Sequence, residues 1–317
     1  MSGWFGSAAA DVGQDEAKGG DKDFRYLPSD EEKETVSWLK EGLEKARNTE
    51  FPPELRDYQF TDTTVLRFHR GRKGDREKAL HGLIKHVEWR QENHVASISE
   101  KDVSEEVQKR KIFVNGKDNN GRPLIWVIAS RHDSSDRDLD VMRMFIIWTI
   151  EQALAANKID QDERMVLVFD LSHFGLACMD YEVVKLLVDI LQINFPDVLE
   201  VAYIVNGPFI FNACWAIIKP WLDPVTVDKV CFCDTDHLYT SLPEGSVVPD
   251  FGAAGPLEAA PATSASPPIS SATTTPPESA ESGRESLAEK MEKLGVGLDQ
   301  SFDNDNSDDD SDEDSEG

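Results

Sequence analysis

The sequence predicts an α/β protein in which a small helical bundle precedes a mixed, mostly parallel sheet. Between residues 29 and 110 the apolar residues recur at helical spacing. From there to residue 253, short apolar runs typical of buried strands alternate with helical patterns, the order that builds a parallel sheet with helices packed on it. The rest of the chain is rich in Ala, Ser, Thr, Pro and acidic residues, a composition that cannot bury a core.

These patterns divide the 317 residues into segments of different character. We expect a disordered N-terminus at 1–28, a helical lobe at 29–110, an α/β lobe at 111–253, and a disordered linker and acidic tail at 254–317. The two central segments together are long enough to bury a sizeable core.

The helical lobe is predicted to contain three helices. The first begins at a capping box made by Ser29 and Glu32. The second begins near Asp62 and the third at Asp75, each followed by apolar residues at helical spacing. The segment that joins these two helices carries a basic cluster, made of Arg67, Arg70, Arg72 and Lys73.

The α/β lobe is predicted to begin with a hairpin, because an Asn-Gly turn at 120–121 separates two apolar runs. The helix expected over 138–157 is apolar nearly all round, so it should be covered on more than one side. A further helix is capped by Asp180. Buried strands are expected over 165–169, 201–205 and 229–232.

The stretch from 195 to 230 is the most informative about function. An Asn-Gly-Pro stop at 206–208 is followed by a helix over 209–218, whose only strongly polar residue is Asn212. Such a helix must be covered by protein or by another apolar medium. The small polar set around it suits a phosphate and its polyol, and consists of Asp197, Thr226 and Lys229. Composition alone does not distinguish this headgroup site from a simple surface ion pair between Asp197 and Lys229.

The net charge of −27 limits the kinds of partner. No basic stripe is present that could replace counterions on phosphates, so no nucleic-acid partner is expected. Any contact with an anionic membrane should be hydrophobic or local. The sequence shows no signal peptide, and the apolar run at 198–218 is interrupted by polar and turn residues.

The sequence predicts neither a metal site nor a catalytic site. Cys231 and Cys233 have no second pair with the spacing of a structural zinc site. No phosphate loop, nucleophile elbow or dinucleotide-binding motif is present. Asp170 and His173 could form a catalytic acid–base pair. However, an Asp at the end of a strand more often caps the following turn. We therefore expect no enzyme activity and no cofactor.

Several motifs then occur in a recognisable order: Leu66-Arg-Phe-His-Arg-Gly-Arg-Lys73, Glu88-Trp89-Arg90, Gly121-Arg-Pro123, Val168-Phe-Asp170, Phe195-Pro-Asp197, Asn206-Gly-Pro208 and Lys219-Pro-Trp-Leu-Asp-Pro-Val-Thr-Val-Asp-Lys229. In these motifs the chain resembles the CRAL-TRIO family, the lipid-binding domain of yeast-type phosphatidylinositol/phosphatidylcholine transfer proteins, over about residues 30 to 250. The resemblance implies a sheet that floors an apolar lipid cavity and a hydrophobic helix that gates its mouth.

The resemblance also implies roles for particular residues. Contacts to the lipid headgroup fall on Arg72, Asp197, Thr226 and Lys229, with Asp197 where the family usually has Glu. The cavity is expected to be lined by Ile125, Trp126, Phe145, Met165, Leu167 and Phe169. The gate helix is expected to contact the membrane through Phe209, Phe211, Trp215 and Ile218. The basic motif departs from the family at His69, Gly71 and Gly74, where Leu, Ala and Phe are usual.

The function implied by the resemblance is to bind a lipid and to transfer or present it between membranes. The expected ligand is phosphatidylinositol or a phosphoinositide. The side chains that hold the choline lipid in the family fall near Ile125, Met165 and Leu167, which are apolar here, so phosphatidylcholine is not favoured. We expect a cytoplasmic protein that associates with membranes peripherally and transiently.

Two alternatives stay open at this point. The first is a carrier of a small isoprenoid such as a tocopherol or a retinoid. The second is a signalling or scaffold module that acts through the acidic tail and a protein partner. In that tail Ser307 and Ser311 each have an acidic residue three positions later, so they are candidate phosphorylation sites.

Overall fold

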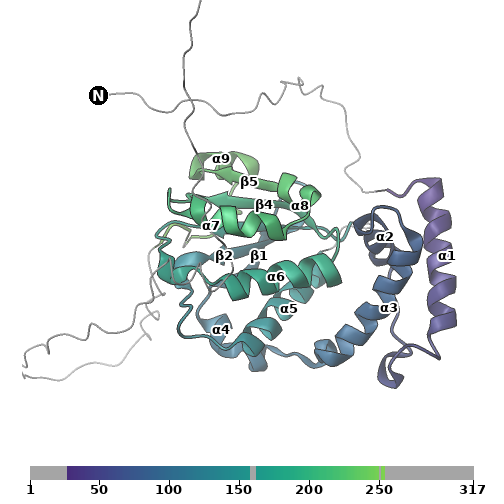
Figure 1. Ribbon diagram of the computed structural model, residues 1–317. Helices are drawn as coiled ribbons and strands as arrows, with labels where there is room; N and C mark the ends of the chain where they lie inside the picture. The colour runs from purple at the N-terminus through teal and green to yellow at the C-terminus, as the bar shows by residue number, and fades with distance from the viewer. Residues whose placement is uncertain (1–26, 158–161, 250, 254–317) are drawn as a thin grey trace, which may run out of the picture. The chain divides into compact units, whose positions relative to one another are not determined.

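The computed structural model describes residues 27–157, 162–249 and 251–253 (Figure 1). The predicted acidic tail, with Ser307 and Ser311, and almost all of the predicted N-terminal segment lie outside these residues. In the described part, N-terminal helices precede a five-stranded mixed sheet with helices packed on it, which confirms the predicted fold class.

The helical lobe is built from α1 (Asp30–Ala46), α2 (Asp62–Gly71) and α3 (Arg76–Glu92). The predicted capping box is present at the start of α1: the Glu32 amide donates to Ser29 Oγ over 3.2 Å and the Ser29 amide donates to Glu32 Oε2 over 2.8 Å. The lobe has a core of its own, in which Leu39, Phe68 and Leu83 are fully buried. Each such side chain stabilises the fold by about 2 kcal/mol.

The sheet contains β1 (Ile112–Lys117), β2 (Pro123–Ile128), β3 (Met165–Asp170), β4 (Leu199–Val205) and β5 (Val230–Cys233). The strands lie in sequence order; β1 and β2 are antiparallel and the other neighbouring pairs are parallel. The hairpin and the parallel strands that the sequence predicts are therefore both present.

The three longer connecting helices share one face of the sheet: α5 (Leu139–Ala156), α6 (Tyr181–Asn194) and α7 (Phe211–Ile218) (Figure 1). This follows from the strand order, because right-handed crossovers between successive neighbours all return on the same side. The other face is covered by α9 (Thr235–Ser241) and by the segment that follows it.

Short helical turns join these elements. They are α4 (Ser104–Gln108), α8 (Pro224–Asp228), and 3-10 turns at Pro53–Leu55, Val95–Ser97, Glu100–Val103, Ala129–Arg131, Leu176–Cys178 and Lys219–Trp221. None of the helices in the described part of the chain combines the length and the apolar character needed to cross a bilayer.

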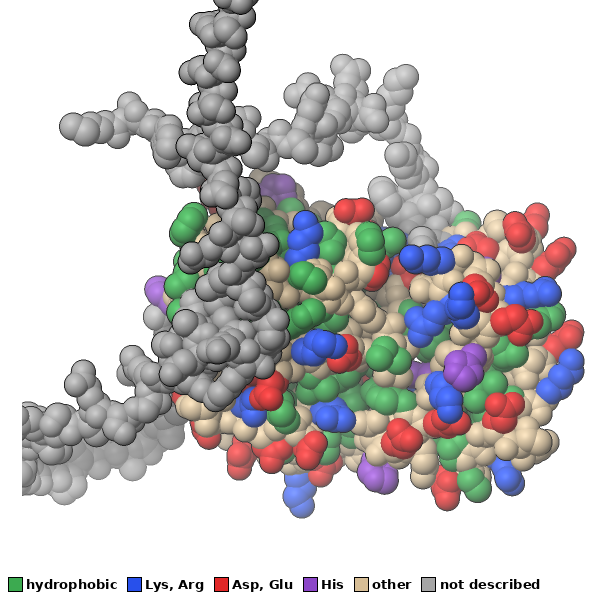
Figure 2. Space-filling view, in the orientation of Figure 1, with side chains coloured by type: hydrophobic (Ala, Val, Ile, Leu, Met, Phe, Trp, Pro, Cys, Tyr) green, Lys and Arg blue, Asp and Glu red, His purple; other side chains and the backbone are tan. Residues whose placement is uncertain are grey.

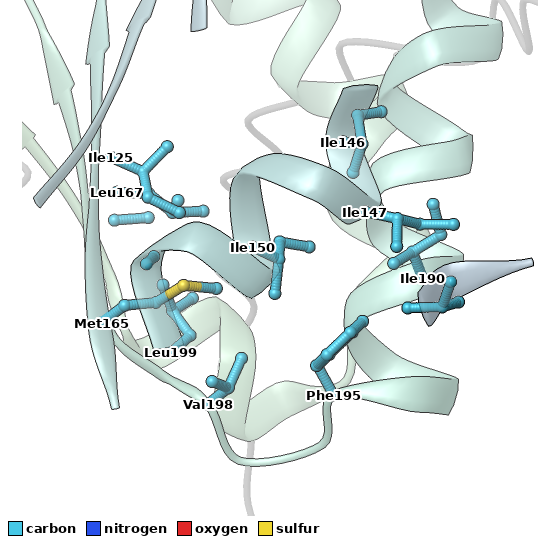
Figure 3. Packing of buried hydrophobic residues seen from close by; sticks show 13 residues of the cluster. Ile125, Ile146, Ile147, Ile150, Met165, Leu167, Ile190, Phe195, Val198 and Leu199 are labelled. Atoms are coloured by element: carbon cyan, nitrogen blue, oxygen red, sulfur yellow. The ribbon is translucent and has the colours of Figure 1, made fainter. Parts of the chain in front are cut away.

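The central strands are buried on both faces, and alternate residues of β1 to β4 belong to different cores. Ile125, Met165 and Leu167 project from the strands toward Ile150 of α5 (Figure 3). Trp126 lies on the opposite face, where it packs against Phe251. The period-two alternation of the strands thus produces two cores, one on each side of the sheet.

Candidate ligand-binding cavity

A cavity of about 480 Å³ lies between the sheet and the helices α5 to α8. Apolar side chains from strands and helices line most of its wall, among them Met142, Ile146, Leu167, Phe169, Leu187 and Ile204. A volume of this size is typical of small-molecule sites, and a mostly apolar lining favours an apolar ligand.

All four predicted headgroup residues line this cavity: Arg72, Asp197, Thr226 and Lys229. Asp197 precedes β4 and Lys229 precedes β5, so both lie at the amino-terminal edge of the parallel strands. Lys229 Nζ lies 3.2 Å from Asp197 Oδ1 and donates to the Leu199 carbonyl over 2.7 Å. The ion pair between Asp197 and Lys229 that the sequence analysis considered is therefore present, and both residues line the cavity.

One carboxylate oxygen of this ion pair lacks a hydrogen-bond partner among the described residues. This atom is Asp197 Oδ2, which is buried. Buried carboxylate oxygens are nearly always hydrogen-bonded, because removing them from water without a partner is costly. A donor supplied by a ligand, such as a hydroxyl, would satisfy this atom.

The turn that presents Asp197 is held by α2. Arg67 is buried and donates through Nη1 to the Pro196 carbonyl over 3.0 Å. Gly71 approaches the same turn so closely that a Cβ at this position would lie 2.5 Å from Pro196 Cβ. Asp197 itself has a φ of +54°, in the left-handed region. The helical lobe therefore sets the position of a residue in the cavity wall.

Thr226 is tied to a residue that the sequence did not single out. Its hydroxyl donates to Asp223 Oδ2, while Asp223 Oδ1 caps α8 by accepting from the amides of Val225 and Thr226. Burial alone would raise the pKa of the Asp223 carboxyl, but these hydrogen bonds bring that pKa below its usual value. The Asp223-Pro224 start of a helix was the signal that could have identified it.

Arg72 lies at this end of the cavity, with its guanidinium on the end of α6. Nη1 and Nη2 donate to the carbonyls of Gln192 and Ile193, over 3.3 and 3.1 Å. A cation suits this place because the last carbonyls of a helix carry partial negative charge. Burial lowers the pKa of Arg72 from its usual value. Lys73, from the same basic segment, also lines the cavity.

The predicted gate helix corresponds to α7, which begins at Phe211 rather than at Phe209. Phe211, Trp215 and Ile218 line the cavity, so these three face inward in this conformation. Phe209 is 90% exposed in the turn just before the helix. Figure 2 shows further apolar side chains interspersed with basic and acidic ones on the face that carries α6 and α8. Of the four residues expected to contact a membrane, Phe209 alone projects into solvent.

The predicted cavity-lining set is corrected by the structure. Of the six residues, Leu167 and Phe169 line the cavity. Ile125 and Met165 belong to the correct face but are covered by α5, and Phe145 packs in a separate cluster with Met142. Trp126 is on the wrong face, and its Nε1 donates to the Asn115 carbonyl over 2.9 Å. Helix α5 fills the part of the sheet that the sequence suggested was open.

The acid–base alternative does not form a pair. The Asp170 carboxylate accepts from the amides of Ser172 and Gly252, over 2.9 and 2.7 Å, and His173 Nε2 donates to the Gly252 carbonyl over 3.0 Å. Both side chains thus join the loop after β3 to the segment at 251–253. Within the described part of the chain, no group of three or more His, Cys, Asp or Glu side chains is arranged to hold a metal ion.

Comparisons with known proteins agree with this architecture. The family model described as the CRAL/TRIO domain matches residues 107–252. A CRAL-TRIO domain-containing protein of Schizosaccharomyces pombe is 30% identical over 205 residues, covering 62% of this chain and 46% of its own length. A phosphatidylinositol transfer protein of Eremothecium gossypii is 33% identical over 231 residues, covering 65% of this chain and 52% of its own length.

A second Eremothecium gossypii protein, named a SEC14 cytosolic factor, is 27% identical over 215 residues, covering 61% of this chain and 70% of its own length. Among solved structures, the crystal structure of Sfh5 matches with a TM-score of 0.57 at 20% identity, over 69% of this chain and 88% of that one. At this identity the structural match speaks for the fold alone. The chain spans about half the length of the first relatives that it matches.

Proposed function

Residues 107–252 form a CRAL/TRIO domain, and from this premise we propose that the protein binds a lipid in the cavity and carries it between membranes. The ligand that we propose is phosphatidylinositol or a phosphoinositide. Relatives of the chain are named phosphatidylinositol or phosphatidylinositol/phosphatidylcholine transfer proteins, which supports a phospholipid as the ligand class.

The choice of headgroup rests on Asp197 Oδ2, which has no hydrogen-bond partner within the described part of the chain and lies next to Lys229 at the end of an apolar cavity. An inositol hydroxyl can donate to this oxygen, and a phosphate can accept from the ammonium. Each acyl methylene buried in the cavity adds about 0.8 kcal/mol. In this proposal the chains provide most of the affinity and the polar end provides the selectivity.

The proposal includes the other properties expected of such a carrier. It acts without catalysis, without a cofactor and without a nucleic-acid partner. It works in the cytoplasm, where it touches membranes peripherally and transiently while lipid is exchanged. The acidic tail, which lies outside the described residues, would serve a protein partner or phosphorylation at Ser307 and Ser311.

The proposed function is tested first by mass spectrometry of lipids extracted from the purified full chain. A stoichiometric phosphatidylinositol or phosphoinositide is the expected result. The second candidate, a carrier of a small isoprenoid, is favoured by the apolar side chains of Leu167 and Phe169 in the cavity wall. Recovery of an isoprenoid in place of a phospholipid would select that candidate and reject the headgroup assignment.

The first prediction concerns Lys229. Lys229→Ala removes the ammonium that faces Asp197 and leaves two carboxylate oxygens without a cation, so transfer of phosphatidylinositol between vesicles should fall about tenfold. Binding of an uncharged lipid such as tocopherol should change little. Lys185→Ala is the matched control, since Lys185 is exposed on α6 and pairs with Asp189 away from the cavity wall. Equal loss for both lipids would remove Lys229 from the headgroup site.

A further inference from the structure

The cavity reaches the protein surface at the end that carries Asp197. Within the described part of the chain, three of the residues that line the cavity are exposed: Gly71, Lys73 and Val225. Gly71 is the last residue of α2, Lys73 lies in the turn that follows, and Val225 belongs to α8. Gly71 also lies against Pro196, the residue before Asp197. These three exposed residues therefore mark the mouth of the cavity.

Hydrogen bonds connect the elements that surround the mouth. Arg72 Nη2, in the turn after α2, donates to the Ile193 carbonyl at the end of α6 over 3.1 Å. Gln192 Nε2, also on α6, donates to the Trp221 carbonyl just before α8 over 3.1 Å. The end of α6 thus contacts both of the segments that contribute the mouth residues.

Two large aliphatic side chains project into solvent beside the mouth. Ile193 is 56% exposed at the end of α6, and Val225 is 58% exposed in α8. They belong to the face on which Figure 2 shows apolar side chains among charged ones. Single exposed apolar residues are ordinary on a protein surface. This pair differs because it flanks the opening of an apolar cavity.

The charges around the mouth nearly balance. In the segments at 72–75, 189–193 and 219–229, three carboxylates are neutralised by lysine partners: Asp75 by Lys78, Asp189 by Lys185 and Asp197 by Lys229. The remaining charged residues of these segments are Arg72, Lys73 and Lys219 against Asp223 and Asp228. Attraction of this surface to a membrane must therefore come mainly from its apolar side chains.

The position of the headgroup residues also favours exchange of lipid at this end. Asp197, Thr226 and Lys229 line the cavity near the mouth, whereas its middle is apolar. A phosphate that entered at the opposite end would have to cross this apolar middle, and an unpaired charge in apolar surroundings is costly. A lipid that enters through the mouth leaves its headgroup there, and only its acyl chains go further.

We propose that Ile193 and Val225 form a docking surface for a lipid bilayer, and that lipid enters and leaves the cavity through the mouth beside them. The two side chains insert at the membrane interface, so the bilayer meets the opening of the cavity. This inference rests on the proposed function in one respect, that the cavity exchanges a lipid with membranes. It adds a membrane contact separate from Phe209, which precedes α7.

Ile193→Asp is the first test, because Ile193 does not line the cavity. Flotation with phosphatidylcholine vesicles measures association of the full chain, and transfer of phosphatidylinositol between vesicles measures exchange. Both should fall about fivefold, because a half-buried aliphatic anchor is lost. The phosphatidylinositol content of the purified variant, measured by mass spectrometry, should equal that of the wild-type protein. Tyr239→Asp is the control, since Tyr239 is equally exposed on α9, and it should behave as wild type.

Val225 separates the polarity of the surface from its shape. Val225→Leu keeps an apolar side chain at this position and should retain association and exchange, whereas Val225→Asp should reduce both. Since Val225 is exposed, neither variant should impair folding. Normal association and exchange in both Ile193→Asp and Val225→Asp overturn the proposal. Slower exchange in Phe209→Asp alone overturns it as well, because the bilayer would then meet the other end of α7.

Salt separates apolar docking from attraction by charge. Association of the wild-type protein with phosphatidylcholine vesicles should be nearly the same at low and high salt, because salt screens only charges. A steep loss of association at high salt would contradict the apolar docking surface.

The lipid content of the same preparations separates this inference from the proposed function. Recovery of phosphatidylinositol together with normal association in both Asp variants rejects only the docking surface. Absence of phosphatidylinositol together with vesicle association that depends on Ile193 rejects the headgroup assignment and retains the docking surface.

Discussion

Gly71 and Asp197 show how two unusual residues can depend on each other. Both positions depart from the family to which the motifs are similar, where Ala and Glu are usual, and the structure places Gly71 directly against Pro196, the residue before Asp197. A glycine lets α2 approach the turn, and the shorter Asp side chain still reaches Lys229 at 3.2 Å. The two departures are therefore compatible with one compact arrangement.

Gly71→Ala should disturb this arrangement. The added Cβ would lie 2.5 Å from Pro196 Cβ, so the turn must shift, and we expect a loss of about 1–3 kcal/mol in the free energy of unfolding. Phosphatidylinositol transfer should fall together with stability, because Asp197 moves with the turn. Urea unfolding and vesicle transfer assays measure the two effects. Gly175→Ala is the matched control, since a Cβ there meets no atom within 4 Å. Unchanged transfer in Gly71→Ala would separate the turn from the headgroup site.

His86 is the residue whose ionisation should affect stability most directly. It is 3% exposed and packs against the rings of Phe68, Trp89 and Phe195. Burial, together with the charges of Arg90 and Arg67, lowers the pKa of His86 from 6.5 to about 3.

The sign of the pH effect follows from this pKa. Between pH 6.5 and about pH 3 the unfolded chain holds a proton on His86 that the folded chain does not, so acidification favours unfolding. The contribution of His86 to the free energy of unfolding should fall by roughly 1 kcal/mol per pH unit in this range. His86→Leu should reduce the measured slope, whereas His81→Leu, at an exposed position of α3, should leave it unchanged. Identical slopes for all three proteins would contradict the assignment.

At the scale of elements, α7 and the turn before it lie between the cavity and the solvent. Its inner side presents Phe211, Trp215 and Ile218 to the cavity, and Phe209 in the preceding turn is 90% exposed. Trp215 also packs edge-on against Phe232 of β5, with ring centroids 5.2 Å apart. Movement of α7 away from the sheet would therefore open the apolar wall and expose an aromatic surface.

Phe209→Asp tests the membrane role of this region without altering the cavity wall. An exposed side chain contributes little to the fold, so thermal unfolding should be nearly unchanged. If Phe209 enters the membrane interface as proposed, lipid exchange with vesicles should slow several-fold, because a charge would replace an aromatic side chain there. Tyr239→Asp is the control, since Tyr239 is 58% exposed on α9, across the sheet from α7. Equal rates for the two variants would place the membrane contact elsewhere.

At the scale of the whole molecule, the two lobes are joined by specific polar contacts. Glu163, just before β3, accepts from Arg67 Nε over 2.9 Å and from the hydroxyls of Thr61 and Thr64. Arg90 of α3 pairs with Glu151 of α5. The contacts of Glu163 connect the helical lobe to the amino-terminal end of β3, the end of the sheet that carries Asp197, so headgroup binding should depend on both lobes.

Deletion of residues 254–317 tests whether lipid transfer requires the acidic tail. The described cores lie entirely within residues 36–251, so the truncated protein should keep its unfolding temperature. Phosphatidylinositol transfer should also survive. Loss of transfer in a truncated protein that remains folded would instead favour the scaffold interpretation, in which the acidic tail is the working part.

The sequence by itself predicted the fold class and the residues that gather at one end of the cavity. Local rules suffice for this: helical spacing and a capping box place the first lobe, and apolar runs between turns place the strands. Motif similarity then identified Asp197 and Lys229, which meet across 32 residues of sequence. Side chains at the amino ends of neighbouring parallel strands are brought together by any such sheet, whatever the packing above it.

Tertiary structure alone decided which face of the sheet borders the cavity and where the cavity ends. Strand alternation defines two faces, but both faces of a parallel sheet are buried, so apolar character could not show that Trp126 lies away from the ligand. The same limit applies to Ile125 and Met165, which α5 covers. Lys111 and Asp180 lie 21 and 48 positions from His132 in the sequence, and both side chains contact its ring. No local spacing encodes such contacts. They arise because packing the helices on one face brings distant loops to the same edge.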